Sequence, residues 1–153
     1  LDIKNLTVDQ AKDIYFRDFY TKNKIENINH EDTALQLFDF SVNAGSNAVR
    51  EMQKILGLNP DGVIGNDTLQ AINNYPNPEK LHNLYYDARV RYYNDLATRR
   101  QSSAQFLKGW LARVAGTTAK KKFILVTGGS FFLGLGFFIL GRMVYKRMKK
   151  VLE

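Results

Sequence analysis

The sequence predicts an all-α fold that ends in a single membrane-spanning helix. Two observations predict the helices: apolar residues recur at helical intervals over most of residues 8–115, and no segment shows sustained two-residue alternation. A third predicts the span: residues 123–141 carry no charge and, at about 1.5 Å per residue, nearly cross a hydrocarbon core of about 30 Å. We expect a basic linker over 116–122, a transmembrane helix over 123–145 and a basic tail over 146–153.

Cap and break residues mark the first two predicted helices. Thr7 and Gln10 have the spacing of a capping box, which predicts a helix over about residues 8–20. A second helix should begin near Glu31 and end at Gly45 as its C′ residue. Because apolar side chains cover most of its circumference, this helix should be central and buried. They are Leu35, Leu37, Phe38, Phe40 and Val42.

The third and fourth predicted helices flank a turn-rich string. Ser46 can cap the third helix, which should end at Gly57 and form an αα-hairpin with the second. The string LNPDGVIG then requires turns, with at most a short strand at its Val-Ile pair. Asn66 or Asp67 should cap the fourth helix, over TLQAINN.

Two further helices complete the predicted bundle. Asn77 and Pro78 have the N-cap and N1 arrangement that begins a helix. The last helix should run from about Ser103 to Ala115, with a linker from Gly116. The inner face of the helix that begins at Pro78 should carry Leu81, Leu84, Tyr85, Ala88, Tyr92 and Leu96.

The net charge of +7 comes from the C-terminal part of the chain. Residues 1–119 hold 14 Lys and Arg against 14 Asp and Glu, whereas residues 120–153 hold 8 against 1. A neutral domain has no electrostatic footprint for a phosphate backbone, so nucleic acid is excluded as a partner. The basic residues that bracket the apolar run fit anionic lipid headgroups, which predicts the lipid bilayer as a partner.

Small residues follow one face of the predicted span, at Thr127, Ser130, Gly134 and Gly141. Such a stripe lets two transmembrane helices pack closely, which allows a homodimer. The flanking positive charges differ by one residue, so they leave the orientation of the span open.

The chain has no cysteine, which excludes disulfides, thiol chemistry and Cys-based zinc sites. Its two histidines, His30 and His82, lie far apart in sequence and leave little for a His-based metal site or a Ser-His dyad. We expect both to be surface helix residues. No metal and no cofactor are therefore expected.

Asp39 and Asn43 lie one turn apart on a helix that is otherwise apolar, so both should project into a shared space. They either line a groove, or Asp39 pairs with a neighbouring helix while Asn43 helps close the helix end. Asp18 is a second candidate carboxylate, although surface solvation is the favoured interpretation. Neighbours do not face each other on a helix, so Asp18 should not pair with Arg17.

The string DGVIGNDTLQAI is the most specific local pattern in the chain. Asp61 and Gly62 form a turn, Gly65 bends the chain, and the polar cluster that ends at Thr68 supplies a helix cap. All of these roles are compatible with a purely structural loop.

Several strings in this order and spacing resemble glycoside hydrolase family 108, the secretion-activator type of peptidoglycan hydrolase, with its fused predicted peptidoglycan-binding domain. Residues 1–57 resemble the C-terminal part of the hydrolase domain, and residues 58–115 the peptidoglycan-binding domain. The strings are LTVDQAKDIYFRDFY, ALQLFDFSVNAGSNAVREMQKILG, DGVIGNDTLQAIN and FLKGWLARV.

The resemblance implies a lysozyme-like helical fold, here partial, that cleaves the glycan strand of peptidoglycan with a glutamate of a Glu-Gly-Gly motif as general acid. This sequence has no Glu-Gly pair, so no catalytic residue is expected in it. It opens at Leu1 without a start methionine or a signal peptide, and we expect it to begin after the catalytic segment and to be inactive alone. The glutamates that do not match are Glu26, Glu31, Glu51 and Glu79.

The resemblance also implies substrate-binding residues. Asp39, Asn43 and Gly45 match the far wall of the groove, and the wall-binding part is matched by Asp61, Gly62, Gly65 and Thr68. The expected function is that of a membrane-anchored peptidoglycan hydrolase (muramidase), or its wall-binding portion, in a bacterial inner membrane and encoded by the bacterium or a phage. The domain should face the cell wall and the tail the cytoplasm. The alternative is a non-catalytic module that binds peptidoglycan and tethers the membrane to it.

Overall fold

The structure is a computed structural model that describes residues 7–118, and within that range it contains helices and turns but no β-strand. The all-α prediction is confirmed, and the short strand allowed at Val63 and Ile64 does not form. The helices are α1 (Val8–Tyr15), the π-helical η2 (Phe16–Thr21), the 3-10 helix η3 (Ile25–Asn27), α2 (Glu31–Ala44), α3 (Ser46–Ile55), α4 (Asn66–Asn73), α5 (Pro78–Arg99), the 3-10 helix η4 (Gln101–Phe106) and α6 (Leu107–Thr118).

The predicted transmembrane helix 123–145 and the basic tail lie outside the described residues. Within residues 7–118, none of the helices combines the length and apolar character that a membrane span requires. Helix α6 continues through Gly116 to Thr118, so the chain is still helical where the sequence predicts that the linker has begun.

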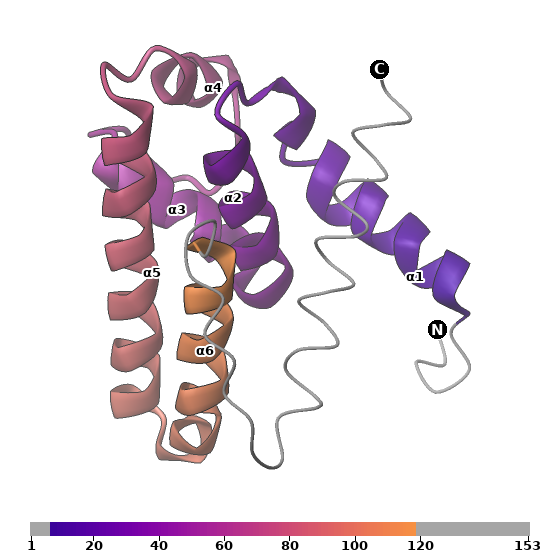
Figure 1. The fold of residues 1–153 in the computed structure, drawn as a ribbon, viewed down its shortest axis with the longest axis vertical. Coiled ribbons are helices and arrows are strands. Elements are labelled where there is room, and N and C mark those ends of the chain that lie inside the picture. The colour runs from indigo at the N-terminus through magenta and orange to yellow at the C-terminus, as the bar shows by residue number, and fades with distance from the viewer. Residues whose placement is uncertain (1–6, 119–153) are drawn as a thin grey trace.

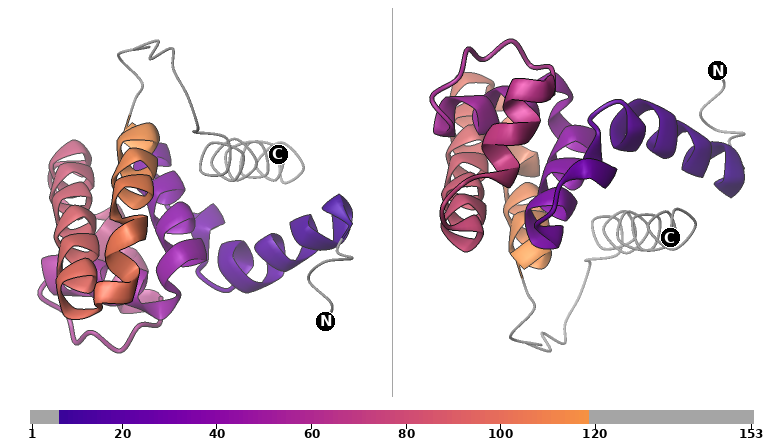
Figure 2. Two further views of the ribbon diagram at one scale, coloured as in Figure 1. Left: turned by 90° about the horizontal axis from the view of Figure 1, so that it is seen from below. Right: turned by 90° about the horizontal axis from the view of Figure 1, so that it is seen from above.

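Helices α2, α3, α5 and α6 pack against one another, and α4 lies against the first half of α5 (Figure 1). Helix α6 runs back beside α5 after the turn at η4. Helix α1 projects away from these helices in all three views (Figures 1 and 2). Its contacts are mainly with η2, the segment that joins it to the rest of the chain.

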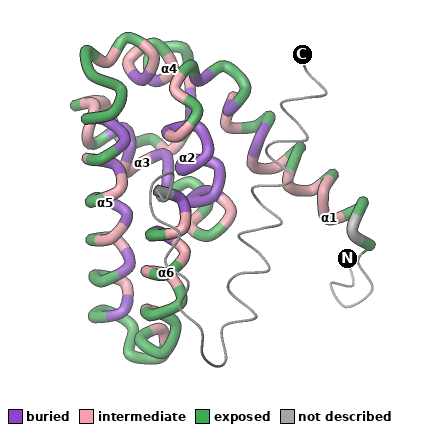
Figure 3. The backbone as a smooth tube through the Cα atoms, in the orientation of Figure 1, coloured by how far each residue is buried: buried purple, intermediate pink, exposed green. Residues whose placement is uncertain are grey.

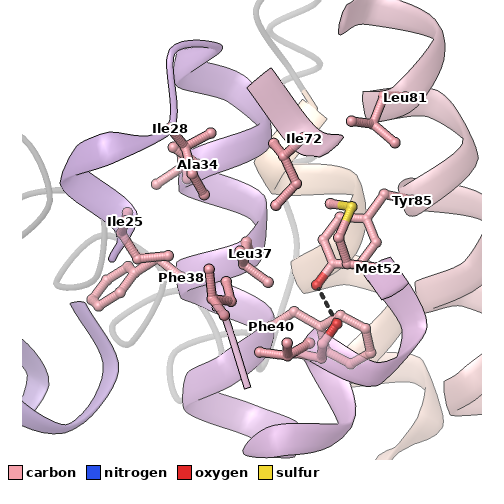
Figure 4. Close-up of a cluster of buried hydrophobic side chains, with 14 of the residues drawn as sticks. Ile25, Ile28, Ala34, Leu37, Phe38, Phe40, Met52, Ile72, Leu81 and Tyr85 are labelled. Atoms are coloured by element: carbon pink, nitrogen blue, oxygen red, sulfur yellow. Dashed lines mark hydrogen bonds between the residues drawn. The ribbon is translucent and has the colours of Figure 1, made fainter. Parts of the chain in front are cut away.

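The core surrounds α2, as its all-round apolar character predicts. Every residue from Thr33 to Ser41 is buried (Figure 3). Apolar side chains from α3, α4 and α5 meet it, and the hydroxyl of Tyr85 donates a hydrogen bond of 2.8 Å to the carbonyl oxygen of Ala48 (Figure 4). Burying one such large side chain contributes about 1.5–3 kcal/mol, so this cluster supplies most of the driving force for the fold.

Several predicted helix ends are confirmed. Thr7 and Gln10 form both hydrogen bonds of the capping box, at 2.9 and 3.2 Å. Asn77 accepts the backbone N–H of Lys80 at 2.9 Å and caps α5. Gly45 ends α2 with a φ of 58°, which a residue with a Cβ rarely adopts.

Two predicted caps are wrong. Gly45 is itself the N-cap of α3, because a single residue separates α2 from α3, and Ser46 is already the first helical residue. Likewise Gly65 is the N-cap of α4, so neither Asn66 nor Asp67 holds that position. In both cases the backbone bend occurs one residue earlier than the nearest polar side chain suggests.

Candidate functional site

Asp39 is a buried carboxylate held by two arginines. Its side chain is 4% exposed, and Oδ2 accepts a hydrogen bond of 2.5 Å from Arg89 of α5. Arg113 of α6 donates through both Nε and Nη2, at 2.9 and 2.6 Å to Oδ1. Asp39 therefore joins α2 to α5 and α6, as the pairing alternative of the sequence analysis proposes.

The cluster formed by Asp39, Arg89 and Arg113 carries one more positive than negative charge. Arg89 is fully buried, and its guanidinium lies 5.1 Å from the centre of the Phe40 ring and 5.6 Å from that of Tyr93. The two aromatic faces attract the cation and partly replace the water that it loses. Burial raises the pKa of the Tyr93 hydroxyl, so this side chain adds no negative charge to the cluster.

Asn43 and Gly45 lie at the exposed end of α2. The Asn43 side-chain amide donates to the carbonyl oxygen of Asp39 at 2.9 Å, which closes the last turn of the helix. The side chain of Asp39 thus points to α5 and α6, while the amide of Asn43 stays on its own helix. These contacts do not place the side chains of Asp39 and Asn43 in a common groove. Their predicted role in binding substrate stays a prediction.

Gln53 of α3 holds the loop of residues 61–68, which we call the Gln53 loop. Its Nε2 donates to Asp61 Oδ1 at 2.7 Å, to the Val63 carbonyl at 2.9 Å and, more weakly, to Thr68 Oγ1 at 3.2 Å. Its Oε1 accepts the backbone N–H of Gly62 at 2.9 Å. One buried amide therefore satisfies polar groups along the whole loop.

Three of the predicted residues of this loop have structural roles. Gly62 has a φ of 82°, and a Cβ built on it would lie 3.0 Å from the Arg50 guanidinium carbon and 3.1 Å from the Cβ of Ser46. Asp61 also accepts the backbone N–H of Val63 at 2.8 Å. Gly65 begins α4, and a Cβ there would meet nothing within 4 Å. The substrate-binding role predicted for these residues remains untested by these contacts.

An open groove of about 410 Å³ lies between the first turn of α3 and the last turns of α5. The amide of Asn47 donates to the hydroxyl of Tyr92 across it, at 3.3 Å. The lining residues are Asn47, Tyr92, Leu96, Arg99 and Arg100. The guanidinium, amide and phenol groups of this groove can donate hydrogen bonds to carboxylates and amide oxygens. Leu96 adds an apolar side chain that can contact the apolar part of a ligand.

The sequence pattern does not reveal this groove. It predicts Tyr92 and Leu96 on the inner face of α5, and both are half-buried where they line the groove. Arg99 and Arg100 read as ordinary solvent charges in the sequence. The groove could be recognised only from the proximity of Asn47 to Tyr92. These residues are 45 positions apart in sequence, so only the folded chain brings them together.

None of the four glutamates is buried, so the described residues offer no glutamate in the apolar setting that keeps a general acid protonated. Glu51 pairs with Lys54 at 2.6 Å, and Glu79 lies 3.6 Å from His30. Asp39 is buried but neutralised by two arginines.

Asp18 pairs with Arg17 on the surface, at 2.7 Å, although neighbours were not expected to meet. The Arg17 guanidinium reaches the neighbouring carboxylate, and this hydrogen bond lowers the pKa of Asp18.

The prediction of two surface histidines is wrong for His82. His82 is 5% exposed, and its ring centre lies 6.1 Å from that of His30. The first turns of α2 and α5 meet, which brings together two residues that are distant in sequence. Burial lowers the pKa of His82, so the ring favours the neutral form.

Comparison with known proteins confirms the resemblance stated from the sequence. Residues 1–45 match the model of glycosyl hydrolase 108, and residues 47–115 match the model described as a predicted peptidoglycan domain. Among solved structures, the chain is similar to SagA of Brucella abortus, with 31% sequence identity and a TM-score of 0.68. The match covers 76% of this chain and 64% of the SagA chain, so it spans less than two thirds of that protein. No curated protein sequence matches the chain.

Proposed function

We propose that this chain, which joins part of a glycosyl hydrolase 108 domain to a predicted peptidoglycan domain, binds peptidoglycan as the wall-binding portion of a muramidase-type hydrolase. The observation that carries the proposal is that the two family matches follow each other almost without a gap, over residues 1–45 and 47–115. The similarity to SagA covers 76% of this chain at 31% identity, which supports a shared architecture rather than a chance local match.

The groove between α3 and α5 is the surface that we assign to peptidoglycan. This polymer presents N-acetyl amides along its glycan and carboxylates on its stem peptides. Arg99 and Arg100 can donate to the carboxylates, and Asn47 can donate to or accept from the amides. The groove adjoins the segment Gly45–Ser46, which connects the two family matches.

The second candidate function is a non-catalytic tether between membrane and wall. It is favoured by the four glutamates, none of which has the buried setting of a general acid within residues 7–118. In this alternative the same groove binds the wall, and no bond is cleaved.

A binding assay and a lysis assay on the full 153-residue chain separate the two functions. We expect the chain to sediment with insoluble peptidoglycan, and the double variant Arg99→Ala/Arg100→Ala to bind at least about tenfold more weakly, since two charge-assisted hydrogen bonds are lost. Arg91→Ala is the matched control, because Arg91 is exposed on the same helix but does not line the groove. Equal binding by all three proteins would remove the groove from the proposal.

Loss of turbidity from a wall suspension is the second measurement. Turbidity loss by the chain alone would establish hydrolysis and overturn the tether. Binding without turbidity loss supports the tether, or a wall-binding portion whose general acid is not among its own residues.

We further propose that residues 123–145 anchor the chain in the inner membrane, with residues 7–118 facing the wall and the tail in the cytoplasm. The uncharged run of residues 123–141 supports the anchor, and the peptidoglycan target supports the orientation. A C-terminal tag in spheroplasts should be protected from added protease. Cleavage of the tag from outside would contradict the orientation.

A further inference from the structure

Three side chains of the kinds that bind metal ions converge where the first turns of α2 and α5 meet. They are His30, Asp32 and Glu79, and one ligand atom from each lies within 4.8 Å of the other two. Within this set, His30 Nε2 lies 3.6 Å from Glu79 Oε1. In a tetrahedral zinc site, ligand atoms about 2.0–2.2 Å from the ion lie roughly 3.3–3.5 Å apart, so this pair needs almost no movement.

The loop that carries His30 is fixed before any ion binds. Asn73, at the end of α4, accepts the backbone N–H of Asn29 at 2.9 Å and donates to the carbonyl oxygen of Asn27 at 2.8 Å. His30 itself is the N-cap of α2, with its side chain one quarter exposed. The backbone that carries the imidazole is therefore held by α2 and α4, while the side chain remains partly open to solvent.

The other ring nitrogen of His30 has a partner that suits metal binding. Nδ1 lies 2.8 Å from the hydroxyl oxygen of Thr33, to which an Nδ1–H can donate. A metal-binding histidine generally donates its second ring N–H in this way, which fixes the tautomer that leaves Nε2 as the ligand. The competing cap contact from the Thr33 backbone N–H to Nδ1 is long, at 3.4 Å, so little stability is lost when the tautomer changes.

The charges of the cluster match a divalent cation. Two carboxylates balance a charge of +2, and the ring of His82, whose centre lies 6.1 Å from that of His30, is buried behind the cluster. Acidic residues in the first turn of a helix also stabilise the helix dipole on their own, by about 0.3–1 kcal/mol each. That explanation accounts for Asp32 and Glu79 separately, but it does not require a histidine between them.

We propose that His30, Asp32 and Glu79 bind a divalent transition-metal ion, best satisfied by Zn²⁺, with solvent as the remaining ligand. Nitrogen and carboxylate oxygen ligands fit Zn²⁺, whereas Mg²⁺ prefers oxygen ligands alone. The ion would join α2 to α5, which lie in the two different family matches. Its role would be to clamp these helices together, and it does not depend on the proposed function.

Calorimetric titration of the untagged, EDTA-treated chain with ZnCl₂ tests the proposal. We expect one equivalent of Zn²⁺ to bind, to persist in excess Mg²⁺, and to raise the melting temperature in an EDTA-reversible way. His30→Asn removes the imidazole but keeps an N-cap side chain, and it should weaken binding at least about tenfold. Glu79→Gln, at an exposed position, should do the same without affecting folding.

Glu31→Gln is the matched control, because Glu31 is exposed in the same first turn of α2 but is not in the ligand set. It should bind Zn²⁺ like the original chain. Three results would each overturn the proposal: no saturable binding, unchanged binding in His30→Asn, or equal weakening in Glu31→Gln and Glu79→Gln. Displacement by Mg²⁺ at similar concentration would also overturn it, since it would indicate attraction to acidic charge alone. Melting curves of the variants in EDTA verify that each is folded.

Discussion

The cluster of Asp39, Arg89 and Arg113 and the Gln53 loop are two polar regions within residues 7–118, built in opposite ways. In the first, the hydrogen-bonded residues are 50 and 74 positions apart in sequence, and all of them carry charge. In the second, the partners of Gln53 lie 8 to 15 positions away, and most of the groups are neutral. The first fixes how helices pack, and the second fixes the path of a loop.

The difference teaches where each region is vulnerable. Removing one member of a buried ion pair leaves a charge without compensation, which costs far more than the pair contributes. Removing one neutral hydrogen bond from a loop costs about 1 kcal/mol, because water and neighbouring groups can replace it. The two regions should therefore respond to substitution on different scales.

The largest effect is expected for Asp39→Asn. The amide keeps the shape of the side chain but removes the negative charge that the two guanidinium groups share, and Arg89 has no access to water. Loss of one partner of a buried pair costs about 3–5 kcal/mol. Urea unfolding followed by circular dichroism would measure this loss.

Asp18→Asn serves as the control for this prediction, since Asp18 also pairs with an arginine but on the surface. Its unfolding midpoint should not change measurably. If Asp39→Asn were equally harmless, the ion pairs would not hold the helices together, and a role of Asp39 toward a ligand would regain weight.

The fold could be predicted from the sequence where the determining residues lie close together in the chain. The capping box at Thr7 and the cap at Asn77 depend on residues three positions away, and both predictions are confirmed. Helix α2 is central because its apolar residues leave no polar face, which is again a property of one segment. The misplaced caps at Ser46 and Asn66 arose where a glycine, rather than a polar side chain, begins the helix.

The candidate site could be predicted only in part, because its contacts are not local. Arg89 has the same appearance in the sequence as Arg91, yet one is fully buried and the other exposed. The carboxylate that pairs with the buried Arg89 belongs to Asp39, on another helix. The convergence of His30 with Glu79 is likewise invisible until α2 and α5 are placed side by side.

A smaller effect is expected for Gly62→Ala in the Gln53 loop. The positive φ disfavours a side chain, and the new Cβ would press on Ser46 and Arg50 at about 3 Å. Together these costs should lower the free energy of unfolding by about 2–3 kcal/mol. Differential scanning calorimetry of the variant would detect the decrease as a lower melting temperature.

Two other glycines separate the causes. Gly57 has a φ of 70° but open space around it, so Gly57→Ala should cost about 1 kcal/mol. Gly65 has a φ of −78° and open space, so Gly65→Ala carries neither cost and should lose only the preference of an N-cap for glycine over alanine, about 0.5–1 kcal/mol. A loss at Gly62 no greater than that at Gly57 would mean that the loop moves away from α3 without penalty.

The smallest effect is expected for Asp61, whose carboxylate is exposed although it organises the loop. Hydrogen bonds from the Val63 backbone and the Gln53 side chain hold the pKa of Asp61 below its ordinary value. Because the folded state binds the proton more weakly than the unfolded state, the stabilisation is present above about pH 4 and is lost as the pH falls through the lower folded pKa.

Asp61→Asn keeps the acceptor oxygen and removes the titration, so the free energy of unfolding of this variant should fall less steeply below pH 4 in acid unfolding. Asp67→Asn, at an exposed carboxylate in the same loop, is the charge-matched control. If both variants flattened the acid dependence equally, general charge repulsion would explain it, and the Gln53 loop would contribute nothing specific to the acid stability of this domain.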